Sequence, residues 1–340
     1  MQSGIDILAI GDVVTDAFIK LLPHEAELDE AAKDHHPLLC MTYGTKIPFE
    51  EAIIIPAVGN SANAAVACAR LGLNVAFYSN VGDDQPGRDT IKALHRHGVS
   101  TEYVHTNEGK KSNYHYVLWY GADRTILIKH EAYQYKLPKI SLSKTPEWIY
   151  LSSIAESAVD LHDEISDYLK THPKVKLAFQ PGTFQIKLGA ERLKQLYSHT
   201  EVLACNKEEA QLISGNTSTE VAELARALHK LGPKQVVITD GPKGSFASDG
   251  TTLWGMPIYP DPAPPYERTG AGDAYTSTYV AALADGQDMP TAMAWGAINS
   301  MSVVQKIGAQ EGLLNSSGIN SWLKKAPASF KATSHKLEAR

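Results

Sequence analysis

A run of small residues ends in an acid at the predicted start of a helix, Thr269-Gly270-Ala271-Gly272-Asp273. Small residues let the backbone approach an anion closely, and the first N–H groups of a helix have no partner inside it. Together with the helix dipole, these groups favour a phosphate or the charge that develops on one. Asp273 lies in the first turn, where it would stay ionised and accept a proton from a hydroxyl late in phosphoryl transfer. Taken alone, this run fits an ordinary helix cap equally well.

Residues suited to binding hydroxyl groups lie nearer the N-terminus. They are Asp12 and Asp16, which follow a predicted strand, and Gly59, Asn60 and Asn63, which open the next predicted helix. An acid just beyond the carboxyl end of a parallel strand is in the usual place for a ligand contact, and asparagine amides both donate to and accept from hydroxyls. Turn and cap roles are the alternatives for these residues.

Two more short strings, one polar and one rich in glycine, follow later predicted strands. Asn206 and Glu209 supply an amide and a carboxylate, the oxygen ligands that Mg²⁺ prefers when it keeps several waters. In the loop that begins at Thr239, Gly241 and Gly244 would let the protein backbone come close to a ligand. A capped, charged first helical turn and an ordinary turn are the alternatives.

Short apolar runs alternate with segments of helical period along most of the chain. The strands predicted are Ile5–Ile10, Val75–Val81, Trp148–Leu151, Val175–Phe179, Val202–Cys205 and Gln235–Thr239. The helices predicted are Ser61–Leu71, Gln85–His97, Ser157–Thr171, Lys187–Tyr197, Thr219–Leu231, Ala271–Ala284 and Pro290–Gln305. Continuous apolar strands between helices indicate a mainly parallel sheet covered on both faces. The predicted fold class is therefore α/β and doubly wound.

Two segments, about 21–56 and 101–135, interrupt this alternation. The second contains a predicted hairpin, with Tyr114–Tyr120 and Arg124–Lys129 as its strands and apolar groups on both faces. Such a hairpin should not stand alone in water, so it either extends the main sheet or forms a small β lid. We expect a lid that covers the substrate, with Tyr116 and Arg124 among its contacts, and that pairs two subunits. The tail after Trp322 is polar and is expected to fray.

Composition excludes several classes of protein. A net charge of −6 and a pI near 6.1 give no general attraction to nucleic acid. No stretch approaches the run of about 20 apolar residues that a membrane helix requires, and the first residues do not read as a signal peptide. The three cysteines, Cys40, Cys68 and Cys205, are far apart, as expected for reduced thiols in the cytoplasm.

The order of these strings resembles the ribokinase (PfkB) family. The G-A-G-D core of its C-terminal signature is intact at Gly270–Asp273, and Gly59-Asn60-x-x-Asn63 resembles its N-terminal signature. The resemblance implies a catalytic base at Asp273 and an anion hole at Gly270, Ala271 and Gly272. It also implies a substrate-binding acid at Asp16, with Asp12 as a second candidate.

The same resemblance covers the nucleotide site. Asn206-x-x-Glu209 is similar to the family's N-x-x-E motif for Mg²⁺ and phosphate, and Thr239-x-Gly241-x-x-Gly244 to its nucleotide loop. Asn299 falls where the family builds its adenine wall. The positions before the Gly-Ala-Gly run lie near a monovalent-cation site in the family, but here they read Glu267-Arg268, so potassium activation is not carried over.

The resemblance implies a single domain over residues 1–340 that phosphorylates a hydroxyl, expected to be a primary one, on a small sugar with ATP and Mg²⁺. A nucleoside is the main alternative acceptor, because the aromatic hairpin could stack a base. A phosphosugar is also open, because Arg124 and Lys187 could meet a phosphate. A non-catalytic sugar- or nucleotide-binding regulator is the alternative class. The chain lacks the P-loop, protein-kinase and Rossmann motifs that would indicate other nucleotide enzymes.

Overall fold

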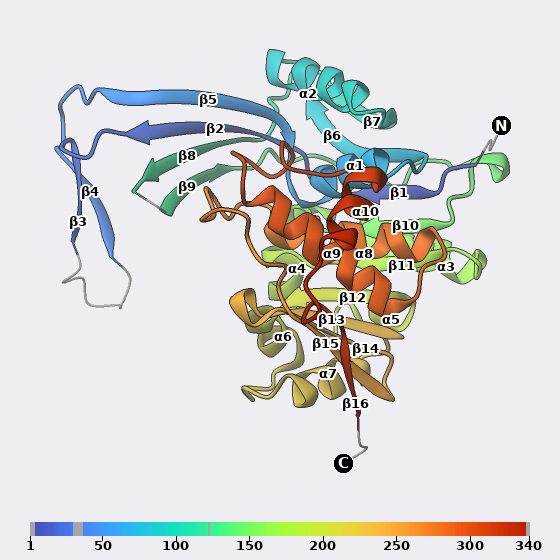
Figure 1. The fold of residues 1–340 in the computed structure, drawn as a ribbon. Helices are drawn as coiled ribbons and strands as arrows, with labels where there is room; N and C mark the ends of the chain where they lie inside the picture. The colour runs from blue at the N-terminus through green and yellow to red at the C-terminus, as the bar shows by residue number, and fades with distance from the viewer. Residues whose placement is uncertain (1–3, 30–36, 122, 338–340) are drawn as a thin grey trace.

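The computed structural model describes residues 4–29, 37–121 and 123–337, and a ten-stranded sheet forms its centre (Figure 1). The seven strands from β7 to β13 run parallel to their neighbours, and the last three are antiparallel. In spatial order the strands are β7 (Ser100–Asn107), β6 (Val75–Gly82), β1 (Ile7–Ile10), β10 (Trp148–Leu151), β11 (Lys176–Phe179), β12 (Thr200–Asn206), β13 (Gln235–Thr239), β14 (Ser245–Ser248), β15 (Thr252–Met256) and β16 (Thr333–Lys336).

Helices cover both faces of this sheet and bury two separate apolar clusters. One face carries α1 (Asn60–Arg70), α2 (Gln85–Arg96), α8 (Ala271–Ala284), α9 (Met289–Val303) and α10 (Ser316–Lys324). The other carries α3 (Val159–Thr171), α4 (Thr183–Leu188), α5 (Lys194–Ser198), α6 (Lys207–Ser214) and α7 (Val221–His229). Successive residues of β1 alternate between the two clusters, as a strand buried on both faces requires. The predicted doubly wound α/β class is confirmed.

Two sequence expectations about the main domain were wrong. The helix expected over Lys187–Tyr197 is two short helices, because Gly189 ends α4 with φ +83°, a left-handed conformation that glycine adopts without strain. The C-terminal tail is not frayed over its described part. Instead β16 pairs with β15, and Phe330 packs edge-on against Tyr259 at a centroid distance of 4.8 Å.

A four-stranded sheet forms an arm that projects from the main domain (Figure 1). Its order is β5 (Phe49–Val58), β2 (Val14–Leu21), β8 (Tyr114–Tyr120) and β9 (Asp123–Lys129). A two-stranded hairpin, β3 (Ala26–Asp29) and β4 (Leu38–Met41), hangs from its far end. The predicted hairpin is confirmed as β8 and β9.

The bounds expected for the inserted segments were partly wrong. The arm begins at Val14 rather than near residue 21, because β2 leaves the main sheet directly after β1 and pairs with β8. Residues 100–107 are not part of the arm. They form β7, which pairs in parallel with β6 at the edge of the main sheet.

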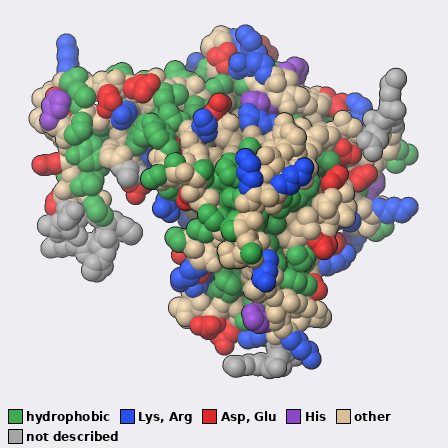
Figure 2. All heavy atoms as spheres, in the orientation of Figure 1, with side chains coloured by type: hydrophobic (Ala, Val, Ile, Leu, Met, Phe, Trp, Pro, Cys, Tyr) green, Lys and Arg blue, Asp and Glu red, His purple; other side chains and the backbone are tan. Residues whose placement is uncertain are grey.

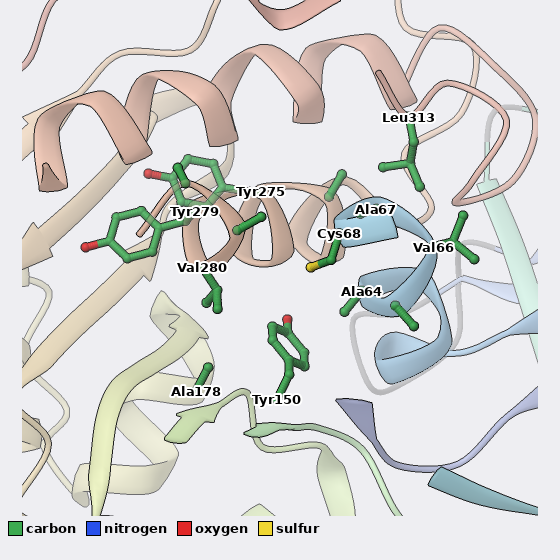
Figure 3. Packing of buried hydrophobic residues seen from close by; sticks show 14 of the residues in the cluster. Ala64, Val66, Ala67, Cys68, Tyr150, Ala178, Tyr275, Tyr279, Val280 and Leu313 are labelled. Carbon is green, nitrogen blue, oxygen red and sulfur yellow. The ribbon is translucent and has the colours of Figure 1, made fainter. Parts of the chain in front are cut away.

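Close packing of α1 against α8 sets the position of the candidate site. Figure 3 shows Ala64, Ala67 and Cys68 of α1 near Val280 of α8, with Tyr150 of β10 pointing between the two helices. All of these side chains are fully buried. Small residues on α1 let the two backbones approach closely, so their N-terminal ends open side by side at one edge of the sheet.

Candidate active site

The candidate residues meet at the carboxyl edge of the parallel strands, where α/β folds bind ligands. Three adjoining hollows lie along this edge. The first lies under the arm, the second is a groove beside α8 and α9, and the third is a polar space between them. Asp273 lines both the first and the third hollow, and Gly272 lines the second and the third. Residues up to 297 positions apart in the chain, Asp12 and Ala309, therefore line one connected space.

Asp273 is buried in the first turn of α8 and bonded through both carboxylate oxygens. Oδ2 accepts from Nδ2 of Asn63 at 2.8 Å, and Oδ1 accepts from Nε2 of Gln180 at 3.0 Å. Burial raises the pKa of Asp273 above its ordinary value, while the two amide donors lower it. A carboxylate in this setting is a better proton acceptor than an exposed one and is held in a fixed orientation.

Gln180 and Gln310, which sequence reasoning missed, fix the groups around Asp273. Gln180 directly follows β11, and its Oε1 accepts from the hydroxyl of Tyr150 at 2.5 Å, which turns its amide nitrogen toward Asp273. Gln310 donates to Oδ1 of Asn63 at 2.9 Å, so Asn63 must also present its nitrogen to Asp273. Gln180 could have been found, because it follows a predicted strand as Asp12 does.

The start of α8 has the geometry that an anion site requires. Gly270 is the N-cap with φ +77°, and a Cβ there would lie 2.3 Å from that of Ala309. The N–H of Ala271 makes only a long contact of 3.4 Å with the carbonyl of Arg268, and Gly270, Ala271 and Gly272 line the polar hollow. Arg268, whose role the sequence did not suggest, lines the groove and the polar hollow beside this turn. The arrangement can hold an anion between backbone amides and a guanidinium.

The hollow under the arm, which we call the substrate pocket, has a volume of about 220 Å³. All five of the residues expected to bind hydroxyls line it: Asp12, Asp16, Gly59, Asn60 and Asn63. The helix caps considered for Asn60 and Ser61 are wrong, because Gly59 is the N-cap and no side chain caps α1. The sequence did not point to His115 of β8 or His130, which also line the pocket.

The groove beside α8 and α9 has a volume of about 440 Å³, twice that of the substrate pocket. Thr239, Gly241 and Gly244 line it as expected, opposite Ala297 and Met301 of α9. Asn299 does not line it, contrary to expectation. That side chain is fully buried between α8 and α9, where it donates to Thr278 and accepts from the N–H of Leu314.

Asn206 and Glu209 lie in the polar hollow and form a reciprocal capping box at the start of α6. Oδ1 of Asn206 accepts from the N–H of Glu209 at 2.8 Å, and Oε2 of Glu209 accepts from the N–H of Asn206 at 2.9 Å. Burial raises the pKa of Glu209, and the charge of Asp273 raises it further. Among the described residues no three or more His, Cys, Asp and Glu side chains form a closed metal site. An open site that completes its shell with phosphates and water fits this donor set.

Tyr116 and Arg124, the arm residues expected to contact the substrate, do not line the substrate pocket. Side chains alternate along β8, so His115 faces the pocket and Tyr116, half exposed, faces outward. Arg124 lines a small separate hollow and lies 3.7 Å from Oε1 of Glu267. It therefore links the arm to the loop before the Gly-Ala-Gly run.

Glu267 is fully engaged by protein donors. Its Oε2 accepts from the N–H of Gly308 at 2.8 Å and its Oε1 from the N–H of Thr269 at 3.2 Å, beside the guanidinium of Arg124. We expect exchange of potassium for sodium at constant ionic strength to change kcat by less than about twofold, because this buried charge is already paired. Steady-state assays in both salts check this. Potassium activation of about tenfold or more would contradict it.

The pH dependence of activity should report the hydrogen bonds of Asp273. Asp273 accepts a proton only when ionised, so activity falls as pH drops through its pKa. Gln180→Leu removes a donor that lowers this pKa. We therefore expect the acid limb of the kcat profile to move to higher pH in this variant. The exposed control Gln195→Leu on α5 should leave the limb in place, and an unchanged limb in Gln180→Leu would contradict the account.

A buried carboxylate at the start of a helix, with adjoining hollows on either side, is the arrangement that a phosphotransferase requires. The chain belongs to the pfkB family of carbohydrate kinases, whose sequence model matches residues 56–316. It is 30% identical to ribokinase of Bacillus subtilis over 266 residues, which cover 75% of this chain and 83% of that protein. It is 28% identical to fructoselysine 6-kinase of Shigella flexneri over 254 residues, which cover 74% and 90%.

Solved structures agree in fold. Arabidopsis thaliana ribokinase, solved in complex with ribose and ATP, superposes with a TM-score of 0.76 at 20% identity, over 94% of this chain and 99% of that one. A Methanocaldococcus jannaschii nucleoside kinase superposes with a TM-score of 0.75 at 19% identity, over 94% and 98%. The chain is thus an ATP-dependent carbohydrate kinase with the ribokinase fold. In the described part of the chain, no helix is long and apolar enough to cross a membrane.

Proposed function

We propose that this kinase transfers the γ-phosphoryl group of ATP to a hydroxyl, expected to be primary, of a small sugar, with Asp273 as the base. The observation that carries the proposal is the position of Asp273. It lies between the substrate pocket and the polar hollow and is aimed by Asn63 and Gln180. A hydroxyl held in the substrate pocket can donate to Asp273 while it attacks a phosphorus atom at the start of α8.

The start of α8 would hold the charge of the transferring phosphoryl group. The N–H groups of Gly270, Ala271 and Gly272 belong to this turn, and Arg268 lies beside it. Preorganised donors of this kind stabilise the transition state without having to reorganise. ATP would occupy the groove lined by Thr239, Gly241 and Gly244, with its phosphates reaching the polar hollow.

Asn206 and Glu209 would hold Mg²⁺ through water, because each already uses one oxygen in the capping box. When bound, the metal supplies charge neutralisation on the phosphate oxygens. Because these two side chains supply too few oxygens for a full coordination shell, phosphate oxygens of ATP would have to complete the metal site. Unpaired cysteines, two of them buried, are in keeping with a cytoplasmic enzyme.

The sugar acceptor is better supported than the alternatives. Of the three rings that could have stacked a nucleobase, Tyr114 and Tyr116 lie on the outward face of β8, with ring centroids 5.2 Å apart. The third, Trp119, lines the separate small hollow rather than the substrate pocket. Phe18 is the one Phe, Tyr or Trp among the described residues that line the substrate pocket. A silent regulator would have no use for a buried carboxylate aimed by two amides.

The outward face of the arm is suited to a homodimer. The strand register aligns Ile54, Ala17, Tyr116 and Leu127 in one row across the four strands. Ile54, Tyr116 and Leu127 are 64%, 50% and 52% exposed, and hydrophobic side chains gather on this arm in Figure 2. Exposed apolar surface of this kind marks interaction sites.

Leu127→Lys should therefore convert a dimer into a monomer. Light scattering after size exclusion at micromolar concentration measures this. The control is Leu142→Lys, because Leu142 is 88% exposed but lies outside the arm. A wild-type monomer, or a Leu127→Lys dimer, would contradict the shared arm.

The test of the proposed function is ADP release from Mg·ATP in the presence of free sugars, amino sugars, nucleosides and phosphosugars. We expect turnover with at least one sugar. Turnover confined to nucleosides would overturn the acceptor class and leave the mechanism standing. Ligand binding without any turnover on the panel would favour the regulator.

A further inference from the structure

The substrate pocket has an unusual balance of charge. The titratable residues that line it are Asp12, Asp16, Asp273, His115 and His130. These are three carboxylates and two imidazoles, and the described residues of the lining include no lysine or arginine. In a space of about 220 Å³ these groups decide which charge on a ligand is tolerated.

The two histidines bridge the two N-terminal acids. Nδ1 of His115 lies 3.3 Å from Oδ1 of Asp16, and Nδ1 of His130 lies 3.2 Å from Oδ2 of Asp12. The Nε2 atoms of the two rings face each other at 3.3 Å. Because the two Nε2 atoms face each other, at most one proton can lie between them. The pair can therefore carry at most one positive charge, which the three carboxylates outweigh.

Other contacts show that the acids retain acceptor capacity. Asp12 also accepts from the hydroxyl of Tyr135 at 2.6 Å, which fixes it and leaves lone pairs toward the pocket. Oδ1 of Asp16 is buried and has no hydrogen bond of normal geometry from any described residue, despite the ion-pair distance to His115. The hydroxyl of Thr269, on the pocket wall, is in the same situation. A bound substrate can donate to Oδ1 of Asp16, and it can either donate to or accept from the hydroxyl of Thr269.

The basic residues considered for a phosphate group are engaged elsewhere. Arg124 pairs with Glu267 and lines the separate hollow beside Trp119. Lys187 is exposed on α4, with its Nζ 5.9 Å from the centre of the Phe184 ring. Neither residue lines the substrate pocket. A phosphate or carboxylate there would face three carboxylates, with no lysine or arginine among the described lining residues to pair it.

We propose that the pocket takes an uncharged or amine-bearing polyhydroxy substrate and rejects phosphosugars and sugar acids, with Asp16 and the His115–His130 pair determining this selectivity. The inference rests on the proposed function for its kinetic readout. Hydroxyl and ammonium groups both donate to Asp16, whereas an anionic group only accepts. Buried polar groups left unpaired, and like charges brought together, are what make such discrimination large.

The test compares matched pairs: ribose with ribose 5-phosphate, fructose with fructose 6-phosphate, and glucose and glucosamine with gluconate. Turnover is measured as ADP release, and binding by titration calorimetry without ATP. We expect kcat/KM for the preferred neutral or amine-bearing compound to exceed that for its anionic partner by about 100-fold or more. Comparable turnover or binding of a phosphosugar or sugar acid would overturn the inference and leave the kinase function intact. Selective binding of neutral compounds with no turnover would support the inference and overturn the kinase function instead.

Variants assign the selectivity to residues. Asp16→Asn should lower the neutral-to-anionic ratio in binding by about tenfold or more, because an amide can donate to an anion. If that variant is poorly folded, His115→Gln provides a second route. It removes the proton that His115 can share with His130 and should also change the neutral-to-anionic binding ratio. Asp167→Asn, exposed on α3, is the matched control and should keep the wild-type ratio. Unchanged ratios in both pocket variants, or no binding of any neutral or amine-bearing compound at millimolar concentration, would also overturn the proposal.

Discussion

Asp273→Asn is expected to lower kcat by about 10³-fold while changing KM little, because a positioned general base contributes about 10²- to 10⁴-fold. The side chain is nearly isosteric, so the contacts that bind substrate through Asp12, Asp16 and Asn63 remain. One of the two amide donors, from Asn63 or Gln180, would meet an amide nitrogen instead of an oxygen. Steady-state kinetics with saturating ATP measure the effect.

Two controls separate loss of the base from loss of the fold. Asp167→Asn makes the same chemical change on the exposed face of α3 and should keep wild-type kcat. Thermal melting of Asp273→Asn should show one cooperative transition. A folded Asp273→Asn variant that kept kcat within about threefold of wild type would remove Asp273 from the role of base.

Gly270→Ala is the second change with a large expected effect. Its φ of +77° is costly for any residue with a Cβ, and the added atom would lie 2.3 Å from Cβ of Ala309. Ala309 itself lines the substrate pocket, so relief of the clash moves either the anion site or the pocket wall. We expect a loss of stability of about 1–3 kcal/mol and a fall in kcat/KM of about 100-fold.

Gly272→Ala is the matched comparison, two residues further along the same turn. A Cβ there has no neighbour within 4 Å and requires no unusual backbone angle, so its melting temperature should stay at the wild-type value. The added methyl group projects where Gly272 lines the groove and the polar hollow, so KM for ATP should rise. Equal stability of the two variants would contradict the strain assigned to Gly270.

The sequence predicted the bounds of an element correctly where the pattern lay within that element alone. The extents of β10, β13 and α8 match the sequence expectation, because each is a continuous apolar or alanine-rich run with clear stops. β2 was missed because it mixes acids and apolar residues and pairs with β8, about 100 residues away. Pairing at that distance leaves no local pattern.

The sequence predicted which strand ends carry the candidate site, but not which side chains of the neighbouring elements point into it. Alternation along β8 showed two faces, yet nothing local said which one lies over the substrate. Tyr116 was therefore chosen where His115 faces the pocket. Asn299 failed in the same way, because the rotation of α9 is set by its packing on α8. Gln310 could not be found, since its role depends on a contact with Asn63 247 positions away.

The central claim is phosphoryl transfer from ATP to a hydroxyl held beside Asp273. Phosphorus NMR of the wild-type enzyme with Mg·ATP and its preferred polyhydroxy compound tests it most directly. The account predicts that the γ-phosphate signal of ATP is replaced by a phosphomonoester signal of equal intensity, together with ADP. Release of inorganic phosphate alone, or unchanged ATP with every sugar and amino sugar of the panel, would contradict it.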